Sequence, residues 1–153
     1  MTEAEIREKL QVAIQKLAAA DAHLLEHDLS ERCIASRLAL YLQQAFPELS
    51  VDVEYNRFGT HPKTMHLPED CANYRSNSGE PLVVPDIIVH RRGAEGPNLL
   101  VLELKKTTNR DSRDCDHMRI RAFREQLGYV HAALIECETR KERAPEVRIV
   151  EWL

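Results

Sequence analysis

The chain has 153 residues, which suits a single domain, and its 43% hydrophobic and 30% charged residues are typical of a globular protein with one core. With 21 basic and 25 acidic residues the net charge is −4, which excludes a general basic coat that binds nucleic acid by charge alone. There is no run of 18 apolar residues and no secretory signal at the acidic N-terminus, so we expect a cytoplasmic protein that does not span a membrane.

The first part of the chain is predicted to be helical. Apolar residues recur with a helical period from residue 3 to about residue 26, and again from about residue 28 to Phe46, where Pro47 ends the second helix. Asp28, followed three residues later by Glu31, predicts the N-cap and the capping-box acid of that second helix.

From Val51 the pattern changes to alternation of apolar and polar residues, which predicts a strand over 51–56. Residues 58–81 have no periodicity and are predicted to form a long loop. Residues 82–91 and 98–106 predict two strands of an antiparallel hairpin. A helix ended by Gly128 follows, and then strands over 129–137 and 147–153.

This order predicts an α/β sandwich around a mixed sheet. The helix between the third and fourth strands permits a parallel crossover at that point. We expect one domain over 1–153, with an N-terminal helical extension (1–27), a core (28–138) and a C-terminal strand (139–153).

Four cysteines are spread along the chain without a Cys-x-x-Cys pair. This spacing predicts free thiols in a reducing compartment. Two of them lie in apolar runs, which predicts that they are buried in the core. The four are Cys33 and Cys137, in the apolar runs, and Cys71 and Cys115.

Three charged residues interrupt the predicted hairpin. Asp86 begins one apolar strand, and Glu103 and Lys105 lie two apart on the next, so their side chains leave the same face of that strand. A charge in such an apolar run is costly unless it is paired or binds a metal. The group therefore indicates either a site for a hard divalent cation or a structural ion pair.

Pro85-Asp86, followed after sixteen residues by Glu103-Leu104-Lys105, resembles the signature of the PD-(D/E)XK nuclease superfamily, also called restriction-endonuclease-like. The predicted order from Ser30 to Cys137, two thirds of the chain, is similar to the αβββαβ core of that superfamily. Ser30-Glu31-Arg32 and Glu54-Tyr55-Asn56-Arg57 are also similar to segments of its small bacterial members. The resemblance implies a mixed central sheet flanked by helices, here with an extra N-terminal helix and a C-terminal strand.

The resemblance also implies metal-dependent hydrolysis of nucleic-acid phosphodiester bonds, with DNA as the expected substrate and Mg²⁺ or Mn²⁺ as the cofactor. Asp86 and Glu103 would hold the metal, helped by the Leu104 backbone carbonyl and by Glu31, and the metal would activate a water. Lys105 would orient that water and stabilise charge in the transition state. A double-strand cutter would need to form a homodimer, which the sequence does not show.

Glu31 has a physical signal of its own. On a helical wheel, Leu38 and Leu42 lie about 20° to either side of it, so Glu31 is centred on the apolar stripe of its helix. Both a capping role and a role as an extra metal ligand remain open for this side chain.

The segment from Lys105 to Arg124 contains seven basic residues against three aspartates. This local excess indicates either a surface that contacts phosphates or a solvated helix face. Lys63, in the long loop, is a further residue that could reach a phosphate. The candidate nucleic-acid contacts are Lys106, Arg119, Arg121, Arg124 and Lys63.

Other function classes remain open. The first alternative is a catalytically silent binding or scaffold module of the same fold, acting with a protein or nucleic-acid partner. The second is a DNA-binding protein without a cutting site. The segment from His23 to His27 matches an inverted-zincin pattern, but a third ligand is not evident, and we interpret the pair as the solvated end of the first helix.

Overall fold

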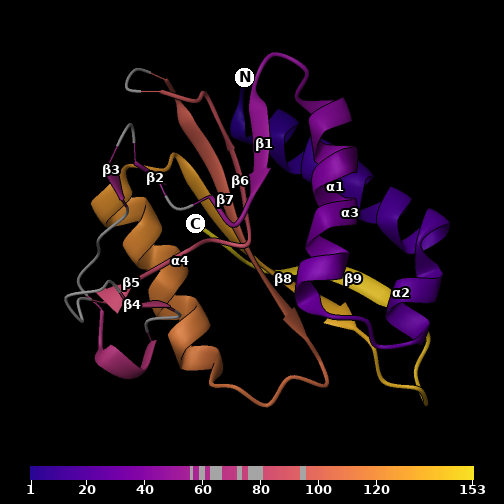
Figure 1. The fold of residues 1–153 in the computed structure, drawn as a ribbon. Helices are drawn as coiled ribbons and strands as arrows, with labels where there is room; N and C mark the ends of the chain where they lie inside the picture. The colour runs from indigo at the N-terminus through magenta and orange to yellow at the C-terminus, as the bar shows by residue number, and fades with distance from the viewer. Residues whose placement is uncertain (56, 59–60, 63–66, 72–73, 76–80, 94–95) are drawn as a thin grey trace.

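The computed structural model describes residues 1–153 except 56, 59–60, 63–66, 72–73, 76–80 and 94–95 (Figure 1). Lys63, one of the expected phosphate contacts, lies outside the described residues. Within the described ranges, none of the helices is both long and apolar enough to cross a membrane.

The N-terminal region contains three helices where the sequence predicts two. They are α1 (Glu3–Ala20), α2 (Ala22–Glu26) and α3 (Glu31–Ala45). The prediction of one continuous helix from residue 3 to about 26 was wrong at Asp21, which separates α1 from α2. The Asp21 carboxylate accepts hydrogen bonds from the Arg37 guanidinium, at 3.2 Å, and from the Tyr41 hydroxyl. Both partners belong to α3, so a tertiary contact fixes the break.

The start of α3 also differs from its prediction. Its N-cap is Ser30, whose Oγ accepts a hydrogen bond from the Cys33 N–H at 3.1 Å, and not Asp28. Asp28 has a positive φ of 53°, and its carboxylate accepts hydrogen bonds from Lys106 and Thr108 instead. The turn before α3 is therefore hydrogen-bonded to residues at and just after the end of a distant strand. Because Ser30 caps the helix, the Glu31 side chain has no capping role.

A five-stranded mixed sheet forms the centre of the molecule. Its strands lie in the order β1 (Ser50–Val53), β6 (Ile87–His90), β7 (Asn98–Lys106), β8 (His131–Glu138) and β9 (Glu146–Trp152). Neighbouring strands are antiparallel except β7 and β8, which are parallel and are connected by α4 (Arg113–Leu127). The predicted hairpin is confirmed, and the parallel crossover that the intervening helix permits is observed.

Between β1 and β6, the described residues form only short elements, in agreement with the predicted loop where it is described. Its described elements are the short strands β2 (Arg57–Phe58), β3 (His61–Pro62), β4 (Tyr74–Arg75) and β5 (Pro81–Leu82) and the 3₁₀ turn η1 (Glu69–Cys71). The strand predicted over 82–91 is shorter than expected, because β6 begins only after Pro85, which has no N–H to donate to a sheet.

Helices cover both faces of this sheet (Figure 1). Leu100, Leu102 and Leu104 of β7 pack in one core with α1 and α3, whereas Val101 packs in a second core with α4. Because side chains alternate along a strand, Glu103 and Lys105 share the face of Val101. The two charged residues therefore point toward α4.

Candidate functional site

Asp86 lies directly before the first residue of β6. Ile87, the first residue of β6, pairs with Leu102 in antiparallel register, so Leu104 lies beyond the N-terminal end of β6. The Asp86 carboxylate accepts this N–H at 2.7 Å, and the Asp86 backbone carbonyl accepts the N–H of Glu54 at 3.1 Å. The Asp86 side chain thus takes the place of a backbone carbonyl as the partner of the Leu104 N–H and is held beside β7.

Glu103 and Lys105 are both buried, at 3% exposure, in the middle of the sheet. The Lys105 ammonium lies 3.0 Å from Asp116 Oδ2, and the Arg119 guanidinium lies 3.2 Å from Glu103 Oε2. Arg119 also pairs with the other oxygen of Asp116. Two residues of α4 thereby link the two charged residues of β7 in one buried network.

Asp116 was not among the residues predicted for the site. Its side chain is 2% exposed and lies between a lysine and an arginine. The helical-wheel test that singles out Glu31 applies here as well, because Phe123 and Leu127 lie about 20° to either side of Asp116. An acid centred on an apolar stripe was therefore a readable signal in the sequence.

The network faces a pocket of about 420 Å³. Six of its twelve lining residues are carboxylic acids, against one lysine and one arginine, so the pocket attracts cations. Predicted and unpredicted residues come together in this pocket. Its lining consists of Glu31, Asp70, Asp86, Glu103, Leu104, Lys105, Asn109, Asp111, Ser112, Cys115, Asp116 and Arg119.

Two acids of the pocket, Asp86 and Glu103, have raised pKa values. Burial raises the pKa of Asp86 from 3.8 to about 6, opposed by the Leu104 hydrogen bond and reinforced by the charge of Glu31. Burial, followed by the charge of Asp86, raises the pKa of Glu103 well above its usual value. Two neighbouring carboxyl groups with raised pKa values form a place where a bound cation would relieve an unfavourable charge.

Glu31 lines the pocket but is already engaged. One of its oxygens accepts the N–H of Lys106 at 2.7 Å, and its carboxylate also accepts hydrogen bonds from the Asn109 amide at 3.0 and 3.2 Å. It therefore fastens the end of β7 to the start of α3. The neighbouring Arg32 pairs with Glu54 at 3.0 Å, so the segment that begins α3 contacts the segment that follows β1.

The side chains that line the pocket can be compared with the ligands that a divalent metal requires. Glu103 Oε1 is buried and has no hydrogen-bond partner among the described residues, and the pocket offers further carboxylate oxygens. In the described part of the chain, however, no three His, Cys, Asp or Glu side chains are grouped closely enough to hold a metal. His23 and His27 therefore have no third ligand among the described residues. Mg²⁺ is commonly bound by one or two carboxylates together with waters and substrate phosphates. Asp86 and Glu103 fit that mode of binding.

A disulfide joins the loop between β1 and β6 to α4, which overturns the prediction of four free thiols. Cys71 and Cys115 are bonded, with their Cα atoms 5.0 Å apart, while Cys33 and Cys137 are free. The two bonded residues are 44 positions apart, so only the tertiary structure brings them together. Closing a loop of this length stabilises the fold by about 4 kcal/mol.

The predicted basic surface is largely neutralised. Lys105 is buried and Arg119 is partly buried, each beside a carboxylate. Lys106 pairs with Asp28 at 3.0 Å, and Arg113 pairs with Glu136 at 3.2 Å. Arg121 is 63% exposed and lies 3.8 Å from Glu151. Arg124 is exposed. Of the expected contacts, Arg119 thus belongs to the pocket, and Arg121 and Arg124 belong to the open face of α4.

Comparison of the chain with protein-family models, with curated proteins and with solved structures finds no match in any of the three.

The raised pKa of Asp86 predicts how the free energy of unfolding of the metal-free protein depends on pH. Below about pH 4 the carboxyl is protonated in both folded and unfolded chains. Between about pH 4 and 6 the unfolded chain releases its proton first, so stability falls as pH rises, by roughly 3 kcal/mol in total. Urea unfolding at several pH values in EDTA would measure this. Stability that rises throughout that interval would contradict the prediction.

Proposed function

We propose that this protein is a metal-dependent nuclease that hydrolyses nucleic-acid phosphodiester bonds, with DNA as its substrate. The observation that carries the proposal is the convergence of Asp86, Glu103 and Lys105 in one acidic pocket. Their sequence pattern resembles a nuclease signature, and adjacent antiparallel strands place them side by side, as that chemistry requires.

The arrangement of the elements supports a restriction-endonuclease-like fold. From α3 onward the main elements follow the order α3, β1, β6, β7, α4, β8, with β7 and β8 parallel across α4. This corresponds to the αβββαβ order that the resemblance implies. The short strands between β1 and β6 and the added β9 do not interrupt the central pairing.

Asp86 and Glu103 would hold Mg²⁺ or Mn²⁺, helped by the Leu104 backbone carbonyl and by Glu31, since both of these residues also line the pocket. When bound, such an ion would offset phosphate charge and make a water more acidic. An acidic pocket repels a phosphodiester, so positive charge is needed there before nucleic acid can enter.

Lys105 would supply the protein's own positive charge to the transition state. Its ammonium is held 3.0 Å from Asp116, which fixes its position in the pocket. Asp116 is therefore a positioning residue, since it acts through Lys105. An oriented charge that is shielded from bulk water, as the buried Lys105 is, stabilises a developing oxyanion more strongly than a mobile charge in water.

A catalytically silent module is the second candidate, and one observation favours it. Arg119 already neutralises Glu103 at 3.2 Å, and no complete three-ligand cluster occurs among the described residues. In such a protein the carboxylates would be structural, and a protein or nucleic-acid partner would bind elsewhere on the surface.

Calorimetric titration of Mn²⁺ and hydrolysis of end-labelled single- and double-stranded DNA separate the two candidates. The wild type is expected to bind Mn²⁺ at millimolar concentration or below and to cleave DNA only with metal, and Glu103→Gln is expected to do neither. Glu125→Gln, the same change at an exposed position of α4, serves as the control. Absence of both binding and cleavage in the wild type would reject the nuclease in favour of the silent module.

A further inference from the structure

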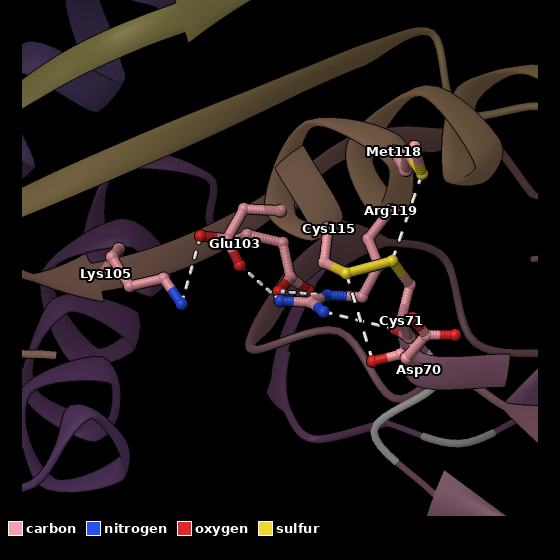
Figure 2. The surroundings of a disulfide bond; sticks show 8 residues. Asp70, Cys71, Glu103, Lys105, Cys115, Met118 and Arg119 are labelled. Atoms are coloured by element: carbon pink, nitrogen blue, oxygen red, sulfur yellow. Dashed lines mark hydrogen bonds and ion pairs between the residues drawn. A yellow bond between two sulfur atoms is a disulfide. The ribbon is translucent and has the colours of Figure 1, made fainter. Parts of the chain in front are cut away.

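The disulfide between Cys71 and Cys115 lies at the candidate site and not in a remote part of the fold. Cys115 and the neighbouring Asp70 both line the acidic pocket. Figure 2 shows the Arg119 side chain lying between Glu103 and Cys71, with the disulfide beside it. The covalent bond therefore attaches η1 to the rim of the same pocket that holds the carboxylates.

Arg119 connects the disulfide to Glu103. Its Nη1 donates to the Cys71 carbonyl at 3.2 Å, its Nε donates to Glu103 at 3.2 Å, and its Nη2 pairs with Asp116. All three nitrogens of the guanidinium are thus engaged. The hydrogen bond to the Cys71 carbonyl helps to hold the guanidinium beside Glu103, where it would compete with a metal ion for the carboxylate.

One of the two bonded residues is accessible to solvent. Cys115 is partly exposed at the start of α4, although Cys71 is 5% exposed. Thiol–disulfide exchange requires access to only one of the two sulfurs. Where disulfides do form in a reducing compartment, they are usually transient, catalytic or redox-sensing.

We propose that the Cys71–Cys115 disulfide is a redox-controlled clamp on the candidate site, a regulatory role that rests on the proposed metal-dependent function. In the oxidised protein the clamp holds η1 and Arg119 in place and lowers the affinity of Glu103 and Asp86 for metal. A dithiol reduces the bond in two exchange steps, leaving two cysteine thiols and becoming a cyclic disulfide itself. Release of η1 frees Arg119 from one partner and widens access to the pocket.

The test compares Mn²⁺ affinity in the oxidised wild type and in Cys71→Ser/Cys115→Ser, which needs no reductant in the titration. Alkylation under denaturing conditions followed by mass spectrometry verifies the state of the cysteines. The double variant is expected to bind Mn²⁺ at least about fivefold more tightly, and reduction of the wild type is expected to close the gap. Cys33→Ser, which removes a free thiol, should retain the affinity of the oxidised wild type.

The outcomes distinguish the clamp from the function on which it rests. Equal Mn²⁺ affinity in both proteins, with the disulfide verified, would overturn the clamp and leave the metal site intact. A wild type that stays fully reduced after mild oxidation would also overturn the clamp. If none of the proteins binds Mn²⁺, the proposed nuclease function fails, and the regulatory role fails with it.

Discussion

Asp86→Asn is expected to stabilise the metal-free protein while strongly lowering the proposed metal-dependent activity. The pKa of Asp86 is raised from 3.8 to about 6, so at pH 8 the folded chain carries an ionised carboxyl that burial disfavours. Asparagine retains an oxygen that can accept the Leu104 N–H and removes the charge. The free energy of unfolding in EDTA should therefore rise by about 2–3 kcal/mol at pH 8.

The same substitution should lower DNA cleavage by at least about 100-fold, because it removes an acid that would hold the metal. Urea unfolding and initial cleavage rates, each with and without Mn²⁺, measure the two effects. Asp114→Asn is the matched control, since Asp114 is an exposed acid on α4. If Asp86→Asn instead lowers the stability of the metal-free protein, the carboxylate is a structural group and not a site held ready for a cation.

Arg119→Met is expected to destabilise the metal-free protein by about 3–5 kcal/mol, because it leaves buried acids without their cation. Glu103 loses the partner at 3.2 Å, and Asp116 retains only Lys105. Mn²⁺ should recover much of this loss, since the metal can replace the guanidinium as the positive charge beside Glu103. Thermal unfolding in EDTA and in saturating Mn²⁺ would show the difference.

Arg121→Met provides the control on the same helix. The Arg121 side chain is 63% exposed and its guanidinium lies 3.8 Å from Glu151, so the change should lower the free energy of unfolding by less than about 0.5 kcal/mol. Glu103→Gln combined with Arg119→Met should cost less than the sum of the single changes, because the pair is coupled. Equal stability of the Arg119 and Arg121 variants would mean that solvent, and not Arg119, balances the charge of Glu103.

Much of the central fold could be predicted from local patterns. Alternation and helical periods identify the strands of the sheet and α4, and the turn between 91 and 98 indicates the hairpin that β6 and β7 form. The errors occur where a distant residue overrides a local preference. Asp21 breaks the first helix through contacts with α3, and Asp28 binds the end of β7 while Ser30 caps α3.

Some residues of the candidate site could likewise be predicted from the sequence, and others were missed. Asp86, Glu103 and Lys105 could be grouped beforehand, because positions two apart on a strand share a face and a hairpin sets neighbouring strands in register. Asp116 was missed, although its place on the apolar stripe of its helix could have been read from the sequence by the test applied to Glu31.

The sequence by itself determined the strands, the main helices and the three charged residues of the hairpin, because these depend on spacing along a few residues of chain. Only the tertiary structure decided which charges meet. The crossover brings α4 over β7 and so pairs Asp116 with Lys105 and Arg119 with Glu103. It also brings Cys115 beside Cys71, 44 positions earlier. Such contacts depend on how elements pack across the core, and no local pattern in the chain encodes that packing.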